Sequence, residues 1–352
     1  MSRATSINLS LQGRVQQSAM RVLANVPLGV LKLRTRVNAD GERLAPEAAI
    51  VAFASRHIPG AALMNGGVDQ SRVLLDEAST ALAESYPPFA IEEDLTIGSS
   101  NGPIPATRYR VDEKGARGLI VLFHGGGFVV GSRASHDSLA RALAVGSGAD
   151  VLSVDYRMAP EHVFPAAVDD SVAAFRFAVE QAADWGLDPR KIVVAGDSAG
   201  GNLSAVVAQQ VRDDAVVPCL QLLIYPAIDL STKRPSVREF GEGLFLTEAD
   251  MDFFTETYLP SPGMLDDPRA TPLKGELAGL APAHIVVAGF DPLRDEGLEY
   301  AAALERAGVE VTLERAGGMI HGFANMGLIS PTARAVVGRM ADAAARAMDA
   351  VN

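Results

Sequence analysis

Much of this chain consists of short, nearly uninterrupted apolar runs, separated by amphipathic helical patterns. Strands that are buried on both faces of a parallel sheet show this kind of continuous hydrophobicity. Because strands and helices alternate, the pattern predicts an α/β architecture with right-handed crossovers. The runs that carry this prediction are Leu119–Phe123, Val151–Val154, Ile192–Ala195, Leu220–Ile224 and Ile285–Ala288.

The first 90 residues differ in texture from the rest of the chain. They contain helical patterns over 38–60 and 69–84 but no strong strand. Strand patterns begin only at Ile91–Ile97 and Ala106–Val111, which a turn signal separates. We therefore expect the α/β domain to begin at residue 91.

A second stretch interrupts the alternation of strands and helices. Between about 228 and 275 no strand is predicted, and the clearest pattern is a helical one at Glu248–Tyr258. An insertion here would cover the carboxyl ends of the strands, where α/β sheets carry their chemistry. We expect this insertion and the N-terminal segment 1–90 to form a helical cap on a domain that spans 91–352.

Composition limits the partners and the location of the protein. The net charge is −12 and the pI about 5.0, which opposes binding to nucleic acid or to an anionic membrane surface. The apolar run Val22 to Leu33 is interrupted by Pro27 and lacks a cleavage site, so we interpret it as part of the cap rather than as a signal peptide. A single cysteine, Cys219, excludes an intramolecular disulfide and fits a reducing compartment. A cytoplasmic location is expected.

The sequence Gly-Asp-Ser-Ala-Gly at 196–200 indicates a nucleophilic serine, Ser198. It follows a strand predicted to end at Ala195 and precedes a helix predicted to open at Gly201, which is the context that a G-x-S-x-G nucleophile elbow requires. Side chains at the two glycine positions would collide with the neighbouring strand and helix. The turn lifts the serine hydroxyl above the sheet, next to the positive potential of a helix N-terminus.

The sequence His-Gly-Gly-Gly at 124–127 follows the strand Leu119–Phe123. Its glycines leave backbone N–H groups unobstructed, which suits an oxyanion hole. A phosphate-binding loop is the competing interpretation, but the dinucleotide pattern would need glycine at Val130 and the nucleoside-triphosphate pattern lysine at Ser132. His124 is interpreted as ordering this loop by hydrogen bonding rather than as a catalytic base.

A serine nucleophile needs a base, and in this arrangement the acid and then the histidine follow the serine along the chain. Only two histidines come after Ser198. His321 lies in a glycine-rich loop after the predicted last strand, Val309–Glu314, and can reach the elbow. His284 precedes a strand and therefore lies at the wrong end of the sheet. His321 is the predicted base.

Asp291 is the predicted acid, because it ends a strand at the edge where the elbow lies. It would hold the His321 imidazole in the required tautomer and stabilise the imidazolium. Asp295 and Glu296 are the alternatives, but acidic residues at a helix N-terminus have a structural explanation.

Upstream of the elbow, Arg157 with Asp155 or Glu161 is predicted to form a buried ion network. No spacing of histidine, cysteine and carboxylate residues resembles a metal site. We therefore expect no metal and no cofactor.

Taken together, the motifs resemble the hormone-sensitive-lipase family of bacterial esterases, often called family IV. The resemblance covers about residue 91 to the C-terminus and rests on five motifs in the same order. The only departure from the usual pattern is Met158, where leucine is common. The five motifs occupy 124–128, 155–161, 196–202, 291–297 and 321–323.

The resemblance implies an α/β-hydrolase fold with a mostly parallel eight-stranded sheet, flanking helices and a helical cap. It also implies a catalytic triad of Ser198, Asp291 and His321. The family's oxyanion donors correspond to the backbone N–H groups of Gly126, Gly127 and Ala199.

The predicted function is hydrolysis of short- to medium-chain carboxylic esters through an acyl-enzyme, with a small-molecule ester as the partner. A true lipase and an amidase that use the same triad are alternatives. A non-catalytic ligand-binding protein on the same fold is a third alternative, like the plant gibberellin receptor, which resembles this family but lacks a complete triad. Pairing of two subunits along the edge of the last strand, giving a homodimer, is a further expectation.

Overall fold

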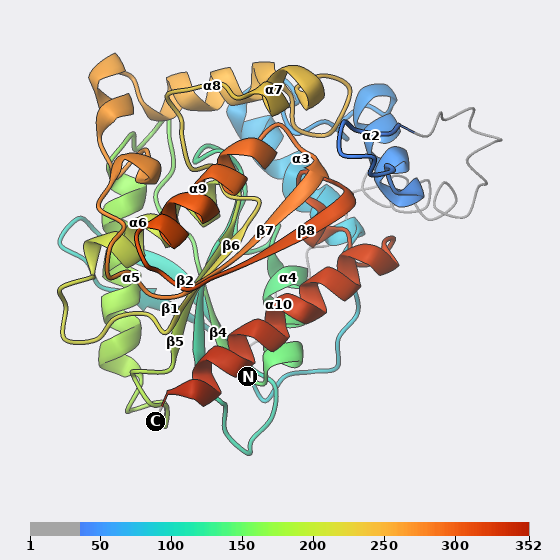
Figure 1. Ribbon diagram of the computed structural model, residues 1–352. Coiled ribbons are helices and arrows are strands. Elements are labelled where there is room, and N and C mark those ends of the chain that lie inside the picture. Colours follow the sequence, from blue (N-terminus) through green and yellow to red (C-terminus); the bar gives the residue numbers. More distant parts are fainter. Residues whose placement is uncertain (1–35, 352) are drawn as a thin grey trace.

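The apolar runs form one eight-stranded sheet in the computed structural model, which describes residues 36–351 (Figure 1). The strand order is β1-β2-β4-β3-β5-β6-β7-β8, and only β2 pairs with its neighbours in antiparallel fashion. The predicted mostly parallel, eight-stranded sheet is therefore confirmed. The strands are β1 (Ile91–Ile97), β2 (Ile104–Arg110), β3 (Leu119–Phe123), β4 (Asp150–Val154), β5 (Ile192–Asp197), β6 (Leu220–Ile224), β7 (Ala283–Phe290) and β8 (Val311–Ile320).

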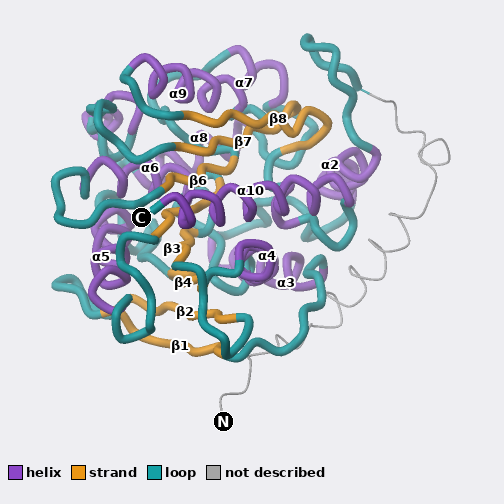
Figure 2. The backbone as a smooth tube through the Cα atoms, turned by 60° about the horizontal axis from the view of Figure 1, so that its bottom comes forward, coloured by secondary structure: helices purple, strands orange, loops and turns teal. Residues whose placement is uncertain are grey.

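Helices cover both faces of this sheet, as Figure 2 shows, with α4 and α10 on one side and α5 and α6 on the other. The reason is the alternation of side chains along each strand. On β3, Ile120 and Leu122 pack in the cluster of α4 and α10, whereas Leu119 and Val121 pack in the cluster of α5 and α6. The helices are α2 (Pro46–His57), α3 (Val68–Ala81), α4 (Asp137–Ser147), α5 (Ala166–Gln181), α6 (Ala199–Gln210), α7 (Pro235–Phe240), α8 (Glu248–Tyr258), α9 (Arg294–Arg306) and α10 (Pro331–Ala350), with short 3₁₀ turns η1 (Pro262–Asp266), η2 (Pro272–Lys274) and η3 (Phe323–Asn325).

The helices outside the alternating pattern gather at one end of the sheet. Figure 1 shows α7 and α8 above the strands with α3 beside them. The helical patterns predicted over 38–60 and 69–84 correspond to α2 and α3, and α8 has the predicted bounds. The run Val22 to Leu33 and the rest of the predicted cap before residue 36 lie outside the described residues.

The prediction for the last strand is wrong at both ends. A loop was expected over 316–320, but β8 continues through Gly317 and Gly318 to Ile320. The glycines serve close approach rather than a turn: Ala45 N donates to Gly318 O at 2.7 Å, and a Cβ at Gly289 of β7 would overlap Gly317 O. A register shift in the β7–β8 pairing accompanies this contact.

Two further boundaries differ from the prediction. β5 extends to Asp197 and α6 begins at Ala199, because pairing with β6 continues through the glycine of the elbow. His284 lies within β7 rather than before it, although it still sits at the amino end of that strand, away from the elbow.

The predicted ion network around Arg157 is wrong in its partners. Arg157 Nη2 lies 2.8 Å from Asp170 Oδ1 on α5, whereas Asp155 and Glu161 bind other arginines. The partner comes from a helix that the tertiary fold brings alongside, so spacing in the sequence could not identify it. No helix within 36–351 has the length and the apolar character that crossing a bilayer would require.

Candidate active site

Ser198 sits on a strained turn between β5 and α6. Its φ angle is 55°, in the left-handed region that residues with a side chain rarely adopt. Its backbone N–H donates to Ile224 O at 2.9 Å, and its carbonyl oxygen accepts from Ala227 N at 3.1 Å. These bonds to the end of β6 and to the loop after it hold the strained turn in place.

The glycines of the elbow are required by close contacts. A Cβ at Gly200 would overlap the carbonyl oxygen of Phe123, and a Cβ at Gly196 would overlap the backbone of Gly200. The collision expected from the sequence motif is thus present in the structure, with β3 as the neighbouring strand. No other residue type fits at these two positions without a backbone shift.

Ser198, His321 and Asp291 form one hydrogen-bonded chain. His321 Nε2 lies 3.0 Å from Ser198 Oγ, and His321 Nδ1 lies 2.8 Å from Asp291 Oδ2. Asp291 follows β7 directly and His321 follows β8, so the carboxyl ends of two adjacent strands carry them. All three side chains are buried, and Asp291 Oδ1 also accepts from Leu293 N at 2.8 Å.

The loop after β3 brings its glycines to the same edge. Gly126 and Gly127 have φ angles of 118° and 62°, which glycine adopts without strain. Neither N–H donates to another atom among the described residues, whereas Gly125 N donates to Asp197 Oδ1 at 2.9 Å. Ala199 is the first residue of α6, where the backbone N–H has no partner within the helix.

His124 orders this loop, in agreement with the interpretation from the sequence. Its Nδ1 lies 2.8 Å from Gly125 O, and its ring stacks on Tyr156 at 4.3 Å between centroids. Tyr156 donates its hydroxyl hydrogen to His124 O at 2.7 Å. Burial of the ring, together with the nearby His136, lowers the pKa of His124 to about 4.

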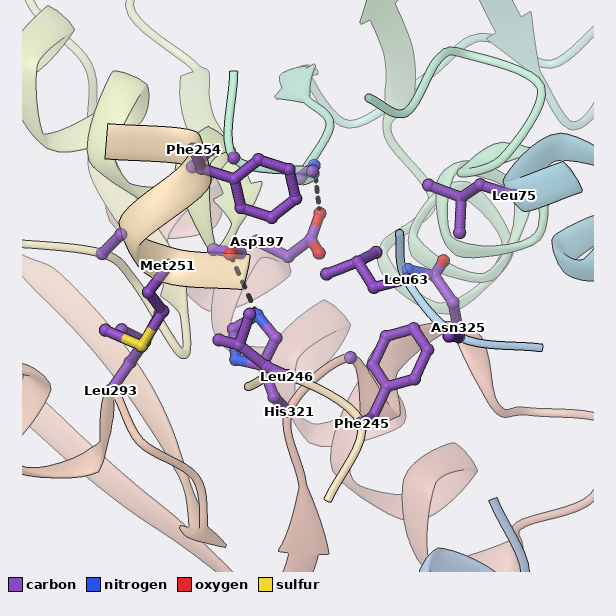
Figure 3. Close-up of a pocket in the computed structure, with 18 of the residues that line it drawn as sticks. Leu63, Leu75, Asp197, Phe245, Leu246, Met251, Phe254, Leu293, His321 and Asn325 are labelled. Atoms are coloured by element: carbon purple, nitrogen blue, oxygen red, sulfur yellow. Dashed lines mark hydrogen bonds between the residues drawn. The ribbon is translucent and has the colours of Figure 1, made fainter. Parts of the chain in front are cut away.

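A cavity of about 370 Å³ opens above Ser198 and His321. Its wall combines apolar side chains from the N-terminal segment with others from the 228–275 segment, and Figure 3 shows Leu75 across the cavity from Met251 and Phe254. The labelled apolar residues are Leu63, Leu75, Phe245, Leu246, Met251, Phe254 and Leu293. A cavity of this size and character suits a small, mainly apolar ligand.

Sequence reasoning missed three buried residues at this site. Glu296 lines the cavity and accepts from Ile228 N at 2.7 Å, and burial raises its pKa to about 8. Asp197 and His136 form an ion pair beneath the glycine loop, with 3.0 Å between Oδ1 and Nε2. His136 precedes Ser198 in the chain, where the expected order of serine, acid and histidine places no base, and the position of Glu296 at a helix N-terminus has a structural explanation of its own.

Within the described residues, no group of three or more histidine, cysteine, aspartate or glutamate side chains is arranged to hold a metal ion. The site brings together a serine hydroxyl, an imidazole, a carboxylate and backbone N–H groups, a set that can carry out acyl transfer.

Comparison with known proteins places this geometry among hydrolases. Residues 120–325 match the protein family described by the alpha/beta hydrolase fold. The chain is 43% identical over 332 residues to the carboxylic ester hydrolase LipN of Mycobacterium tuberculosis (strain ATCC 25618 / H37Rv), an alignment that covers 90% of this chain and 87% of that protein. It is 40% identical to an ethyl acetate hydrolase of Pseudomonas putida, covering 74% and 84%.

Solved structures give the same picture. A hyperthermophilic esterase from the archaeon Pyrobaculum calidifontis superposes with a TM-score of 0.81 at 38% sequence identity, covering 86% of this chain and 98% of that one.

Proposed function

This chain belongs to the α/β-hydrolase-fold family, and we propose that it is a carboxylesterase whose nucleophile is Ser198. Within that family it is a carboxylic ester hydrolase of the hormone-sensitive-lipase type. The observation that carries the proposal is the hydrogen-bonded chain from Asp291 through His321 to Ser198.

The first half of the reaction acylates the serine. Ser198 Oγ attacks the ester carbonyl carbon while His321 Nε2 accepts the hydroxyl proton. The oxyanion of the tetrahedral intermediate accepts hydrogen bonds from the N–H groups of Gly126, Gly127 and Ala199. His321 then gives its proton to the leaving alcohol oxygen as the carbon–oxygen bond breaks.

The second half releases the acid. A water molecule attacks the acyl carbon and its proton goes to His321, which returns it to Ser198 Oγ as the acyl bond breaks. Throughout, Asp291 Oδ2 accepts from His321 Nδ1, which fixes the tautomer and stabilises the imidazolium. His321 accepts the Ser198 proton only as the neutral imidazole.

The proposed substrates are small-molecule esters of short to medium chain length. Acyl and alcohol groups must share a cavity of about 370 Å³. Its mainly apolar walls favour uncharged chains over charged ones, because burying a charge among apolar side chains costs free energy.

We further propose that residues before 91 and the 228–275 insertion act together as a cap. The support is that both contribute to the cavity wall, Leu63 and Leu75 from the first and Met251 and Phe254 from the second. A homodimer paired along β8, which is an edge strand, stays a prediction that sedimentation velocity measures. The cytoplasmic location likewise stays a prediction.

The decisive experiment is hydrolysis of p-nitrophenyl esters from acetate to palmitate by wild type and Ser198→Ala. We expect cleavage of the shorter esters by the wild type and a loss of roughly 10⁴-fold or more in kcat for the variant. The matched control is Ser171→Ala, which removes another buried serine hydroxyl, on α5 and away from the cavity.

Labelling with an organophosphate separates the remaining alternatives. A stoichiometric adduct on Ser198 supports a catalytic serine, and its absence favours a ligand-binding protein. Cleavage of amides in preference to esters, or activity only on emulsified long-chain esters, would replace the carboxylesterase proposal with an amidase or a lipase.

A further inference from the structure

A buried polar cluster lies beneath the glycine loop, and the proposed mechanism uses none of its side chains. Its centre is Asp197, the residue before Ser198, and its outer part is the turn from Ser132 to His136 ahead of α4. Asp197 and His136 are 3% and 5% exposed. A charged pair removed from water to this extent costs free energy, so its presence beside the nucleophile calls for a physical reason.

Asp197 joins the two halves of the site. Its Oδ1 accepts from Gly125 N of the glycine loop at 2.9 Å and lies 3.0 Å from His136 Nε2. Its Oδ2 accepts from the Tyr225 hydroxyl at 3.3 Å. A Cβ at Gly125 would come within 2.6 Å of Oδ2, so the loop backbone rests directly on this carboxylate.

The hydrogen-bond partners of His136 favour a positive charge on its ring. Its Nδ1 lies 2.9 Å from Ser135 Oγ. Ser135 Oγ also lies 2.9 Å from Ser132 O, and when its single hydrogen is donated there, Ser135 Oγ accepts from His136 Nδ1. On the other side of the ring, Nε2 faces Asp197 Oδ1, which is an acceptor when ionised.

Both ring nitrogens of His136 therefore face acceptors, and only imidazolium can donate from both. Gly125 N also lies 3.2 Å from His136 Nε2, but a protonated Nε2 cannot accept. That N–H goes instead to Asp197 Oδ1, which is nearer.

We propose that His136 is a buried imidazolium that pairs with Asp197 and so holds the oxyanion loop against the nucleophile elbow. This inference rests on the proposed esterase function. His136 is a positioning residue, because it acts on the reacting atoms only through Asp197 and the glycine loop.

The surroundings of His136 support a single positive charge at this place. The titratable groups that face it are Asp197 of the elbow, His124 at the end of β3 and Asp76 of α3. Burial of the ring lowers the pKa of His136, but Asp197 more than offsets this, and the net direction is upward. His124, whose ring centroid lies 5.7 Å away, has its pKa lowered to about 4 and stays neutral.

The charge of His136 has a consequence for the proposed transition state. Without it, the Asp197 carboxylate would be an unpaired anion one residue from Ser198, close to where the oxyanion forms. Like charges repel most strongly in a water-excluded site. The imidazolium balances the negative charge of Asp197, and Asp197 Oδ1 still accepts from Gly125 N.

The kinetic test removes the charge but keeps the hydrogen bond. In His136→Gln the amide nitrogen can donate to Asp197 in place of Nε2. We expect kcat for p-nitrophenyl acetate to fall roughly tenfold or more, with KM within about twofold of the wild type. His162→Gln, at an exposed histidine, is the matched control and should match the wild type.

The double variant His136→Gln/Asp197→Asn separates charge from structure. It removes both charges while an amide oxygen still accepts from Gly125 N. We expect kcat to return to within about threefold of the wild type, because no unpaired anion is left. An unchanged kcat in His136→Gln, or a double variant no better than the single one, overturns the proposal.

A measurement independent of activity decides the charge state. ¹⁵N chemical shifts of the histidine rings, with His136 assigned from the His136→Gln spectrum, should show both of its nitrogens protonated from about pH 6 to about pH 8. An unprotonated Nδ1 or Nε2 at neutral pH overturns the inference, whether or not the protein cleaves esters. Absence of esterase activity in the wild type would instead overturn the proposed function and leave the ring result standing.

Discussion

The nucleophile elbow and the wall of the cavity adjoin one another, yet they are built from different kinds of contact. The elbow is held by backbone against backbone: Ser198 N bonds to Ile224 O, and Gly200 touches the carbonyl oxygen of Phe123. The wall is made of side chains such as Leu75 of α3 and Met251 of α8, which are only partly buried.

These two kinds of contact respond differently to substitution. Backbone atoms in contact cannot move apart without shifting the strands. The position of the Ser198 turn therefore requires glycine, which has no Cβ, at the two neighbouring positions. Side chains on separate helices can be trimmed or enlarged while the sheet stays intact. We therefore expect changes at the elbow to abolish chemistry and changes in the wall to alter selectivity.

The largest expected effect comes from adding one methyl group at the elbow. Gly200→Ala places a Cβ on the carbonyl oxygen of Phe123, which forces the turn to move. We expect kcat/KM for p-nitrophenyl acetate to fall by roughly 10²-fold or more. Gly338→Ala, in α10, is the control, because a Cβ there meets nothing within 4 Å. Alanine is also more favourable than glycine inside a helix, by about 1 kcal/mol. Equal activity in the two variants would remove the distinction between the regions.

An intermediate effect is expected in the wall. Leu75→Ala enlarges the side of the cavity formed by α3 and should shift the preference toward longer esters. The ratio of kcat/KM for hexanoate to that for acetate should rise roughly tenfold, while kcat for acetate changes by less than about threefold. Leu74→Ala, which does not line the cavity, should leave the ratio unchanged. A loss of kcat on every ester would show that the wall is as rigid as the elbow.

The smallest effect on turnover is expected at the join between the regions, where a substitution changes the pH dependence of stability instead. Burial raises the pKa of Glu296 from the usual 4.5 to about 8. Between these pH values the folded state holds a proton that the unfolded chain has lost, so the free energy of unfolding decreases as the pH rises, by up to about 1.4 kcal/mol per pH unit.

Glu296→Gln removes that dependence, because its side chain cannot ionise and can still accept from Ile228 N. Urea denaturation at several pH values in this range gives the free energy of unfolding. Its slope against pH should be smaller for Glu296→Gln than for the wild type. Glu305→Gln, at an exposed glutamate of the same helix α9, should keep the wild-type slope. Identical slopes for Glu296→Gln and the wild type would mean that Glu296 is ionised in the folded protein.

Local patterns predicted the elements that depend on local chemistry. The continuous apolar runs identified the buried strands, and α8 has the bounds that its periodicity indicates. The order of motifs also selected Ser198, Asp291 and His321, which the structure brings into one hydrogen-bonded chain. Each of these residues follows a strand, and the carboxyl ends of parallel strands lie at the same edge of a sheet. That rule was sufficient to predict that the three side chains lie close together.

Features that depend on contact between distant segments were not predicted. The glycines at 317 and 318 indicate a loop when taken alone, and only the N-terminal segment lying across them explains why they continue β8. The pairing of Asp197 with His136 could not be predicted from the sequence, because the two residues are far apart in the chain and no pattern links them.

Short-range spacing and hydrophobicity were enough to predict the fold class and to propose Ser198 as the nucleophile, with Asp291 and His321 following it in the chain. Only the tertiary structure decided the shape of the cavity, the burial of Glu296 and the partner of Asp197. Those properties arise where helices from different parts of the chain exclude water from one another, and the resulting burial changes what a carboxylate or an imidazole does.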